Sequence, residues 1–320
     1  PYFLYASSNI GSFLALLSYP VLLEPVFTLR TQNLIWTGGY GLLIVLIASC
    51  GVLLLRAPAN AAALNMPADD TEAPAPSWIL RARWIFLAAV PSGLLIAVTA
   101  HISTDVAAAP LLWVLPLSLY LLTWVLVFQS RPLLPHKFML MLQPLAIMGV
   151  ILLLAIGIDQ NLLLTLGGHQ LCFFIIAMAC HGELARTRPA AKYLTGFYVA
   201  LSFGGMVGGL FAGLIAPFTF SWVAEYPILV ALAVLCRPPA EERWPKWSRW
   251  FWPLLAIIAV ALIAPSYSSG KIFTWLETNR VYVVGAVAVV SMILAILLKA
   301  DRWKMAAVVT LALVLIRMYP

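Results

Sequence analysis

Four polar side chains lie inside stretches of this sequence that are otherwise apolar, and their types could support chemistry. They are Asn9, Gln143, His169 and Gln170. A polar side chain within a bilayer is costly, so it commonly marks a functional contact or a hydrogen bond inside the protein. The imidazole of His169 can relay a proton, contact a substrate or ligate haem, although the sequence offers no second axial haem ligand. The alternative is a packed, hydrogen-bonded histidine. In either case we predict that His169 faces protein or a cavity rather than lipid.

A further candidate pair, His101 and Asp105, is four residues apart at the end of an apolar stretch. Residues i and i+4 share a face of a continuous helix, so these side chains could form an ion pair or half of a metal site. The alternative is a cap at the membrane interface, with Thr104 and Asp105 in a turn. We assign no metal ion to this pair.

Small residues recur in one later stretch at helical spacing. They are Ser202, Gly204, Gly205, Gly208, Gly209 and Gly213. Glycines four residues apart form a smooth groove that lets a neighbouring helix backbone approach closely. Three interpretations are open, namely packing within a bundle, a hinge or sliding face of a transporter, and an oligomer interface. We predict that Gly205 and Gly209 pack against another helix.

Several sequence motifs of enzymes are missing. The sequence contains no GxxxxGK[ST] motif, no GxGxxG after a strand and no HExxH motif. These motifs hold nucleotide phosphates, dinucleotides and catalytic zinc, respectively. The sequence therefore indicates no catalytic centre and no cofactor within these residues, and it leaves open whether a longer protein is an enzyme.

The elements that would position these residues are membrane-spanning helices. The sequence is 63% hydrophobic and 10% charged, whereas a soluble domain has about 25% charged residues. Apolar stretches long enough to cross a hydrocarbon core of about 30 Å recur along the chain. We predict an all-α, polytopic transmembrane bundle of about eleven spans. The predicted spans are 3–24, 33–55, 84–102, 110–129, 138–157, 161–180, 193–216, 221–236, 250–265, 281–298 and 304–318.

The lysines and arginines predict the orientation of these spans. If residue 1 lies in the cytoplasm, most of the 19 basic residues fall in cytoplasmic loops, as the positive-inside rule requires. The exceptions are Arg30, Lys271, Arg280 and Arg317. This bias explains the net charge of +7 without a nucleic-acid partner. We expect a multi-pass protein of the bacterial inner membrane, in contact with the lipid bilayer and with Pro320 outside. A re-entrant segment at 250–265 is the alternative.

Composition divides the chain into five segments. Residues 1–56 hold two predicted helices, and residues 57–83 form a Pro- and Ala-rich cytoplasmic linker that we expect to be flexible. Residues 84–236 form a predicted six-helix transmembrane bundle. Residues 237–250 interleave basic residues with tryptophans, which is typical of a segment on an anionic membrane surface. Residues 251–320 hold about three further predicted helices.

Four stretches of the sequence carry a family resemblance. They are PYFLYASSNIGSFLALLSYP at 1–20, VPSGLLIAVTAHISTDVAAAPLLWVLPLSLYLLTWVLVF at 90–128, CHGELARTRP at 180–189 and LTGFYVALSFGGMVGGLFAGLIAP at 194–217. They resemble the membrane region of the bacterial fused major-facilitator/spermidine-synthase-like family. The resemblance implies a fold that is major-facilitator-like in part. It also implies an aminopropyltransferase-like domain in full-length relatives, which this sequence lacks, so no catalytic residue is assigned here. The basic loop signature of true major facilitators is not visible. If four spans preceded Pro1, the linker at 57–83 would be the central cytoplasmic loop.

Three functional hypotheses follow from these observations. The chain is a transporter-like membrane domain for an unidentified small solute. Alternatively, it is an accessory or structural subunit that binds other membrane subunits of a larger complex. The third hypothesis is a membrane anchor of a spermidine-synthase-like transferase whose soluble domain is missing here. A polar-lined cavity would favour the first hypothesis, and a solid bundle with a large apolar interface would favour the second.

Overall fold

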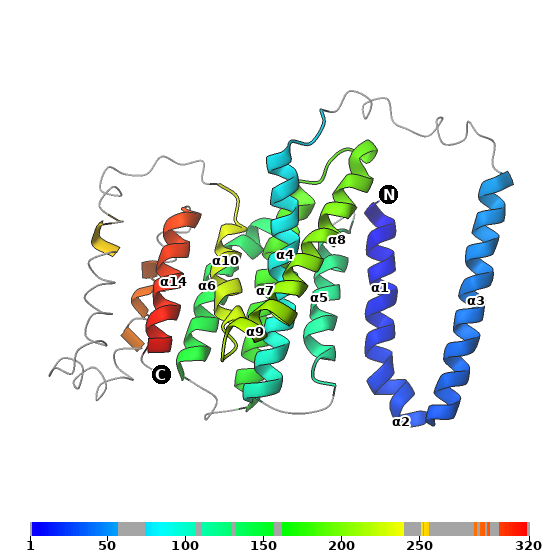
Figure 1. The fold of residues 1–320 in the computed structure, drawn as a ribbon, viewed down its shortest axis with the longest axis horizontal. Helices are drawn as coiled ribbons and strands as arrows, with labels where there is room; N and C mark the ends of the chain where they lie inside the picture. The colour runs from blue at the N-terminus through cyan, green and yellow to red at the C-terminus, as the bar shows by residue number, and fades with distance from the viewer. Residues whose placement is uncertain are drawn as a thin grey trace.

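The computed structural model describes residues 2–56, 74–106, 111–129, 132–156, 162–239 and 301–318, with short pieces between residues 251 and 294. Within these residues every regular element is a helix (Figure 1). This confirms the all-α part of the prediction.

The first helices form a hairpin, which we call the N-terminal hairpin, at residues 2–56 (Figure 1). Pro20 lies in a π-helical turn between them, where its missing N–H removes an α-helical hydrogen bond. The chain then reverses, and α3 runs opposite to α1 (Figure 1). The elements are α1 (Tyr2–Ser18), η1 (Tyr19–Leu23), α2 (Glu24–Val26) and α3 (Leu29–Arg56).

The other helices pack together in what we call the main bundle. Helix α7 lies at its centre and contacts α4, α5 and α6. The elements are α4 (Trp78–His101), η3 (Ile102–Val106), α5 (Val114–Val127), α6 (His136–Ile156), α7 (Leu162–Arg186), η4 (Ala191–Tyr193), α8 (Leu194–Leu210), η5 (Phe211–Ile215), α9 (Ala216–Thr219), α10 (Glu225–Leu235) and α14 (Arg302–Met318).

Six helices in the described residues are long and apolar enough to cross a membrane, rather than the eleven that we predicted. They are Ser7–Val26, Leu29–Arg56, Trp78–Thr104, His136–Ala155, Leu162–Arg186 and Ala191–Thr219. Two predicted spans are helical but short, because α5 has 14 residues and α10 has 11. Helix α14 has 17 residues, and most of the spans predicted at 250–265 and 281–298 lies outside the described residues.

Two segment boundaries need comment. The predicted linker at 57–83 ends too late, because α4 already begins at Trp78. The Ser77 hydroxyl starts this helix by accepting a hydrogen bond from the backbone N–H of Leu80 at 3.2 Å. Residues 57–73 of the linker, and all but the first three residues of the predicted surface segment at 237–250, lie outside the described residues.

Helices α4 and α8 make a close contact through glycines. A Cβ atom on Gly204 would collide with the carbonyl oxygen of Ile85, and one on Gly208 would collide with that of Ala89. Gly205 and Gly209 have only ordinary contacts, at 3.8 Å to Ser92 Oγ and 3.6 Å to a methyl group of Ile96. Gly205 and Gly209 therefore face another helix, as predicted, while the tightest approach of the two backbones is at Gly204 and Gly208, one residue earlier on α8.

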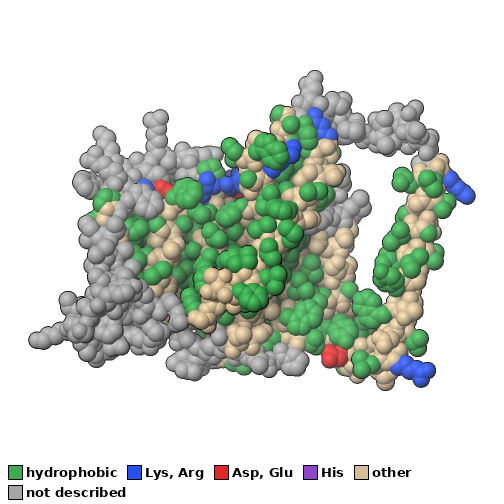
Figure 2. All heavy atoms as spheres, viewed as in Figure 1, with side chains coloured by type: hydrophobic (Ala, Val, Ile, Leu, Met, Phe, Trp, Pro, Cys, Tyr) green, Lys and Arg blue, Asp and Glu red, His purple; other side chains and the backbone are tan. Residues whose placement is uncertain are grey.

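Basic side chains gather at one end of the molecule. Figure 2 shows most of the visible Lys and Arg along the edge where α3 ends and α4 begins. Helix α10 ends there and α14 starts there. A hydrogen bond joins the two helix ends, because Arg302 Nη1 donates to the Arg237 carbonyl oxygen at 3.2 Å. The end of α10 and the start of α14 thus lie at the same end of the main bundle. We call it the basic end, and the positive-inside rule predicts that it is cytoplasmic.

Candidate functional site

Three rings from three helices meet near the other end of the main bundle. His169 of α7 is 1% exposed, and its Nδ1 atom lies 2.8 Å from the hydroxyl of Tyr226 on α10. His101, the last residue of α4, stacks on Tyr226 with ring centroids 5.3 Å apart. The rings of His101 and His169 meet edge to face at 4.8 Å. We call these three residues the ring cluster, and its histidines face protein rather than lipid.

The ring cluster forms part of the wall of a cavity of about 770 Å³. This volume lies in the range of small-molecule sites, about 300–1,000 Å³. His101 and Tyr226 line the cavity, and Glu225 supplies a carboxylate. Among the described residues that line this cavity there is no lysine or arginine. The site can therefore offer hydrogen bonds and negative charge to a small solute.

The carboxamide of Gln170 is the neighbour of His169 in sequence and is also buried, at 4% exposure. Neither its nitrogen nor its oxygen has a hydrogen-bond partner among the described residues. Buried amides are normally satisfied, so each such exception requires an explanation. Gln170 follows His169 on α7, and adjacent residues on a helix point about 100° apart. Gln170 is not among the residues that line the cavity with His101.

The structure does not bring the predicted polar residues together. Gln143 lies at the basic end, where its amide donates to the Ala233 carbonyl oxygen at 2.9 Å and accepts from Arg237 Nη1 at 3.0 Å. It therefore joins α6 to α10. Asn9 instead lines a separate cavity of about 340 Å³ with Tyr120 and Tyr198.

The predicted pair of His101 and Asp105 stays a prediction, because the side chain of Asp105 lies outside the described residues. Among the described residues, His101 contacts His169 and Tyr226. Within the described residues, no group of three or more His, Cys, Asp or Glu side chains could hold a metal ion. The ring cluster could not be read from sequence spacing, because its members are far apart in the chain.

A buried carboxylate organises the basic end, and the sequence analysis missed it. The Glu183 side chain is 0% exposed, and Arg83 Nη2 donates to it at 2.8 Å. Arg186 adds two hydrogen bonds at 2.7 and 2.8 Å, and His136 Nε2 lies 3.3 Å away. Arg83 and Arg186 had been counted only as loop charges. The signal was present, because Glu183 is the one acid in the stretch CHGELARTRP.

Arg237 extends this polar network from the end of α10. Its Nη1 atom donates to the Leu140 carbonyl oxygen at 2.7 Å as well as to Gln143. Burial lowers the pKa of the Arg237 guanidinium from its usual value. A guanidinium nevertheless stays protonated in proteins, so Arg237 supplies a fixed positive charge at the basic end.

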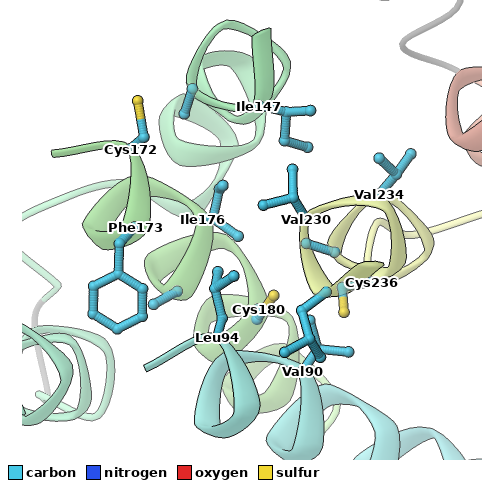
Figure 3. Close-up of a cluster of buried hydrophobic side chains, with 14 of the residues drawn as sticks. Val90, Leu94, Ile147, Cys172, Phe173, Ile176, Cys180, Val230, Val234 and Cys236 are labelled. Carbon is cyan, nitrogen blue, oxygen red and sulfur yellow. The ribbon is translucent and has the colours of Figure 1, made fainter. Parts of the chain in front are cut away.

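An apolar layer separates the two ends. Figure 3 shows Leu94, Ile147, Ile176 and Val230 converging from four helices, and all of them are at most 3% exposed. On α7, Phe173 and Ile176 lie between His169 and Glu183. The separation of fourteen positions between His169 and Glu183 corresponds to about 21 Å along the helix, at 1.5 Å per residue. The bundle thus has a polar site near each end and a closed core between them.

Comparisons with known proteins give no further assignment, since no family model, no curated protein and no solved structure matches this chain.

Proposed function

We propose that this chain is a transporter-like membrane domain that takes a small solute into the cavity beside the ring cluster. The observation that carries the proposal is the cavity itself, which His101, Tyr226 and Glu225 line. A membrane protein gains little stability from such a space, because close packing is what holds its helices together. The three polar groups instead suit recognition of a ligand.

The chemistry of the cavity narrows the class of solute. Glu225 is 4% exposed, and the described residues that line the cavity supply no lysine or arginine to neutralise it. A buried carboxylate is stabilised by a cation or by hydrogen-bond donors. The solute that fits is therefore cationic or rich in hydrogen-bond donors. An anionic solute would be repelled.

The presence of a polar site near each end of the main bundle supports transport rather than binding alone. The apolar layer of Leu94, Ile147, Ile176 and Val230 would have to open for a solute to pass from the ring cluster toward Glu183. Helix α8 meets α4 through Gly204 and Gly208, where the two helix backbones pack closely without bulky side chains between them. Such a contact permits sliding, which is a common mode of transporter motion.

The test begins with a panel of cationic, neutral and anionic solutes added to the purified protein. We expect a cationic or neutral solute to raise its thermal stability, and Tyr226→Phe and His169→Phe to abolish the increase while the ligand-free protein stays folded. Ser202→Ala, which lies in the separate cavity beside Asn9, should keep the full effect. Uptake of that solute into proteoliposomes should then be reduced by His169→Phe. An increase only with anions, or one unaffected by both ring-cluster variants, would refute the proposal.

Two other functions each have one supporting observation. An accessory or structural subunit is favoured by α3, whose apolar window has no buried residue and is open to a neighbouring subunit. A transferase anchor is favoured by the resemblance of residues 90–128 and 180–189 to fused major-facilitator/spermidine-synthase-like proteins. A stable co-purifying membrane subunit would support the first alternative. A reading frame that continues into a glycine-rich nucleotide motif would support the second.

A further inference from the structure

Several rings line the cavity beside the ring cluster, and they come from separate parts of the chain. Phe220 and Trp222 belong to the connection between α9 and α10. Tyr226 follows in the first turn of α10, and His101 ends α4. The Ala224 N–H donates to the Trp222 carbonyl oxygen at 2.7 Å, which holds the connection in a turn. The fold thus gathers rings around one cavity.

Part of this aromatic wall is fixed in place. The Tyr226 hydroxyl lies 2.8 Å from His169 Nδ1, and the Tyr226 ring stacks on His101 with the two planes 28° apart. Tyr226 is also only 1% exposed. The faces of aromatic rings are electron-rich and attract cations, with tryptophan the strongest of them. The wall therefore has a set shape and a surface that suits positive charge.

A carboxylate in the same wall lacks a partner among the described residues. Glu225 lines the cavity and is 4% exposed, and the described residues give its side chain no hydrogen bond and no ion pair. Buried charges in proteins are normally paired and hydrogen-bonded. The Glu225 side chain therefore indicates that a cation from outside the chain belongs in this cavity.

The rest of the lining distinguishes between kinds of cation. It is largely apolar, with Leu154, Leu313 and Ile316 among its members, and apart from the rings and Glu225 its polar side chains are Thr104 and Ser221. A primary ammonium has three N–H donors and is strongly hydrated, so it needs several acceptors. A quaternary ammonium has no donor to satisfy, and its methyl groups pack against aromatic and apolar walls alike.

We propose that the cavity beside the ring cluster binds an organic cation that carries a quaternary ammonium group. This assignment rests on the proposed function and names the class of solute within it. Glu225 balances the charge of the cation, and Trp222 provides a ring from the connection between α9 and α10. The cavity volume of about 770 Å³ leaves room for a trimethylammonium group and its substituent.

The test measures binding of radiolabelled choline to the purified protein, with two unlabelled competitors. One is the uncharged carbon analogue of choline, in which a tert-butyl group replaces the trimethylammonium group. The other is ethanolamine, which has a primary ammonium in the same place. We expect unlabelled choline to compete at least about tenfold better than either, because only choline combines positive charge with methyl groups that pack on the rings.

Three variants examine the residues that carry the proposal. Trp222→Leu should weaken choline binding about tenfold, and Trp222→Phe, which keeps a ring, should weaken it less. Glu225→Gln should weaken choline binding at least about tenfold, since it removes the opposite charge, and should leave binding of the uncharged analogue unchanged. The thermal midpoint without ligand checks that each variant is folded.

Trp113→Leu is the matched control. Trp113 is 48% exposed, close to the 41% of Trp222, but it lines a different cavity. This variant should bind choline as the parent does. Equal losses in Trp113→Leu and Trp222→Leu would overturn the site, because they would reflect only the role of tryptophan at a membrane interface.

The outcomes separate this assignment from the proposed function. If another cationic or neutral solute stabilises the protein while choline does not bind, or while ethanolamine binds more tightly than choline, the quaternary ammonium assignment is overturned and the proposed function stands. If no cationic or neutral solute stabilises the protein, both are overturned.

Discussion

The N-terminal hairpin and the main bundle use comparably apolar helices in different ways. None of the most apolar window of α3 is buried, whereas 56% of the corresponding window of α4 is buried. The α3 window is nevertheless the more hydropathic of the two. Hydropathy therefore indicates that a helix is compatible with lipid, and it does not indicate what that helix packs against.

Close backbone contacts and paired polar groups distinguish the main bundle. Gly208 touches the backbone of α4, while a Cβ on Gly39 of α3 would meet nothing within 4 Å. Glu183 is buried among cations, while Glu24 of the hairpin is exposed. Lipid tails provide no hydrophobic drive between helices, so contacts of this kind must supply the stability. The same substitution should therefore have unlike effects in the two regions.

The largest difference is expected for the two glutamates. Glu183→Gln leaves Arg83 and Arg186 without a carboxylate, and breaking a buried ion pair costs about 3–5 kcal/mol. The free energy of unfolding, measured by titration with dodecyl sulfate in mixed micelles, should fall by about that amount. Glu24→Gln should leave it unchanged. Equal effects of the two changes would mean that the Glu183 network contributes little to the fold.

Glycine substitutions should give the next largest difference. Gly208→Ala puts a methyl group against the Ala89 carbonyl oxygen, and overpacking of this kind costs about 1–3 kcal/mol. Gly39→Ala should be neutral or slightly stabilising, because alanine favours a helix by about 0.5–1 kcal/mol over glycine. Gly205→Ala is the control within α8, since its nearest neighbour is 3.8 Å away. A loss at Gly205 as large as that at Gly208 would contradict the observed contact face.

Serine substitutions should give the smallest difference. The Ser92 hydroxyl donates to the Gly205 carbonyl oxygen at 3.0 Å and so joins α4 to α8. The Ser49 hydroxyl donates to Val45 of its own helix at 2.7 Å. Interhelical hydrogen bonds in membranes contribute about 0.6 kcal/mol on average. Ser92→Ala should lower the unfolding free energy by about that amount in the same titration, and Ser49→Ala should not change it.

Much of the helical layout could be predicted, because continuous apolar stretches permit few alternatives in a bilayer. The predicted spans 33–55 and 138–157, for example, lie within a few residues of α3 and α6. The ends of α5 and α10 were less predictable. The tryptophans and prolines that flank α5 and α10 are as apolar as the helices themselves. Composition therefore does not mark where either helix ends and the adjoining turn begins.

The sites were harder to predict than the helices, for two physical reasons. Gly204 and Gly205 each begin a series with spacing of four, and only the position of α4 decides which series makes the tighter contact. His101 and His169 were both noticed, but Tyr226 was not, because a tyrosine in an apolar stretch carries no signal before its partner is known. Glu183 was overlooked because an acid near the end of an apolar stretch carries no signal that it is buried, whereas its side chain is 0% exposed in the structure.

The central claim is that a polar site lies near each end of the main bundle, at opposite faces of a membrane, with an apolar layer between the two. The direct measurement is the reaction of single cysteines with a membrane-impermeant thiol reagent, in a Cys50→Ser background because Cys50 is exposed and the other three cysteines are buried. Ser221→Cys, in the cavity beside the ring cluster, should react only in intact cells. Lys137→Cys, in a cavity of about 450 Å³ that His136 and Arg186 also line at the basic end, should react only in inside-out vesicles. Ile176→Cys in the layer should react from neither side without solute. Reaction of Ser221→Cys and Lys137→Cys from the same side, or rapid reaction of Ile176→Cys, would contradict the account.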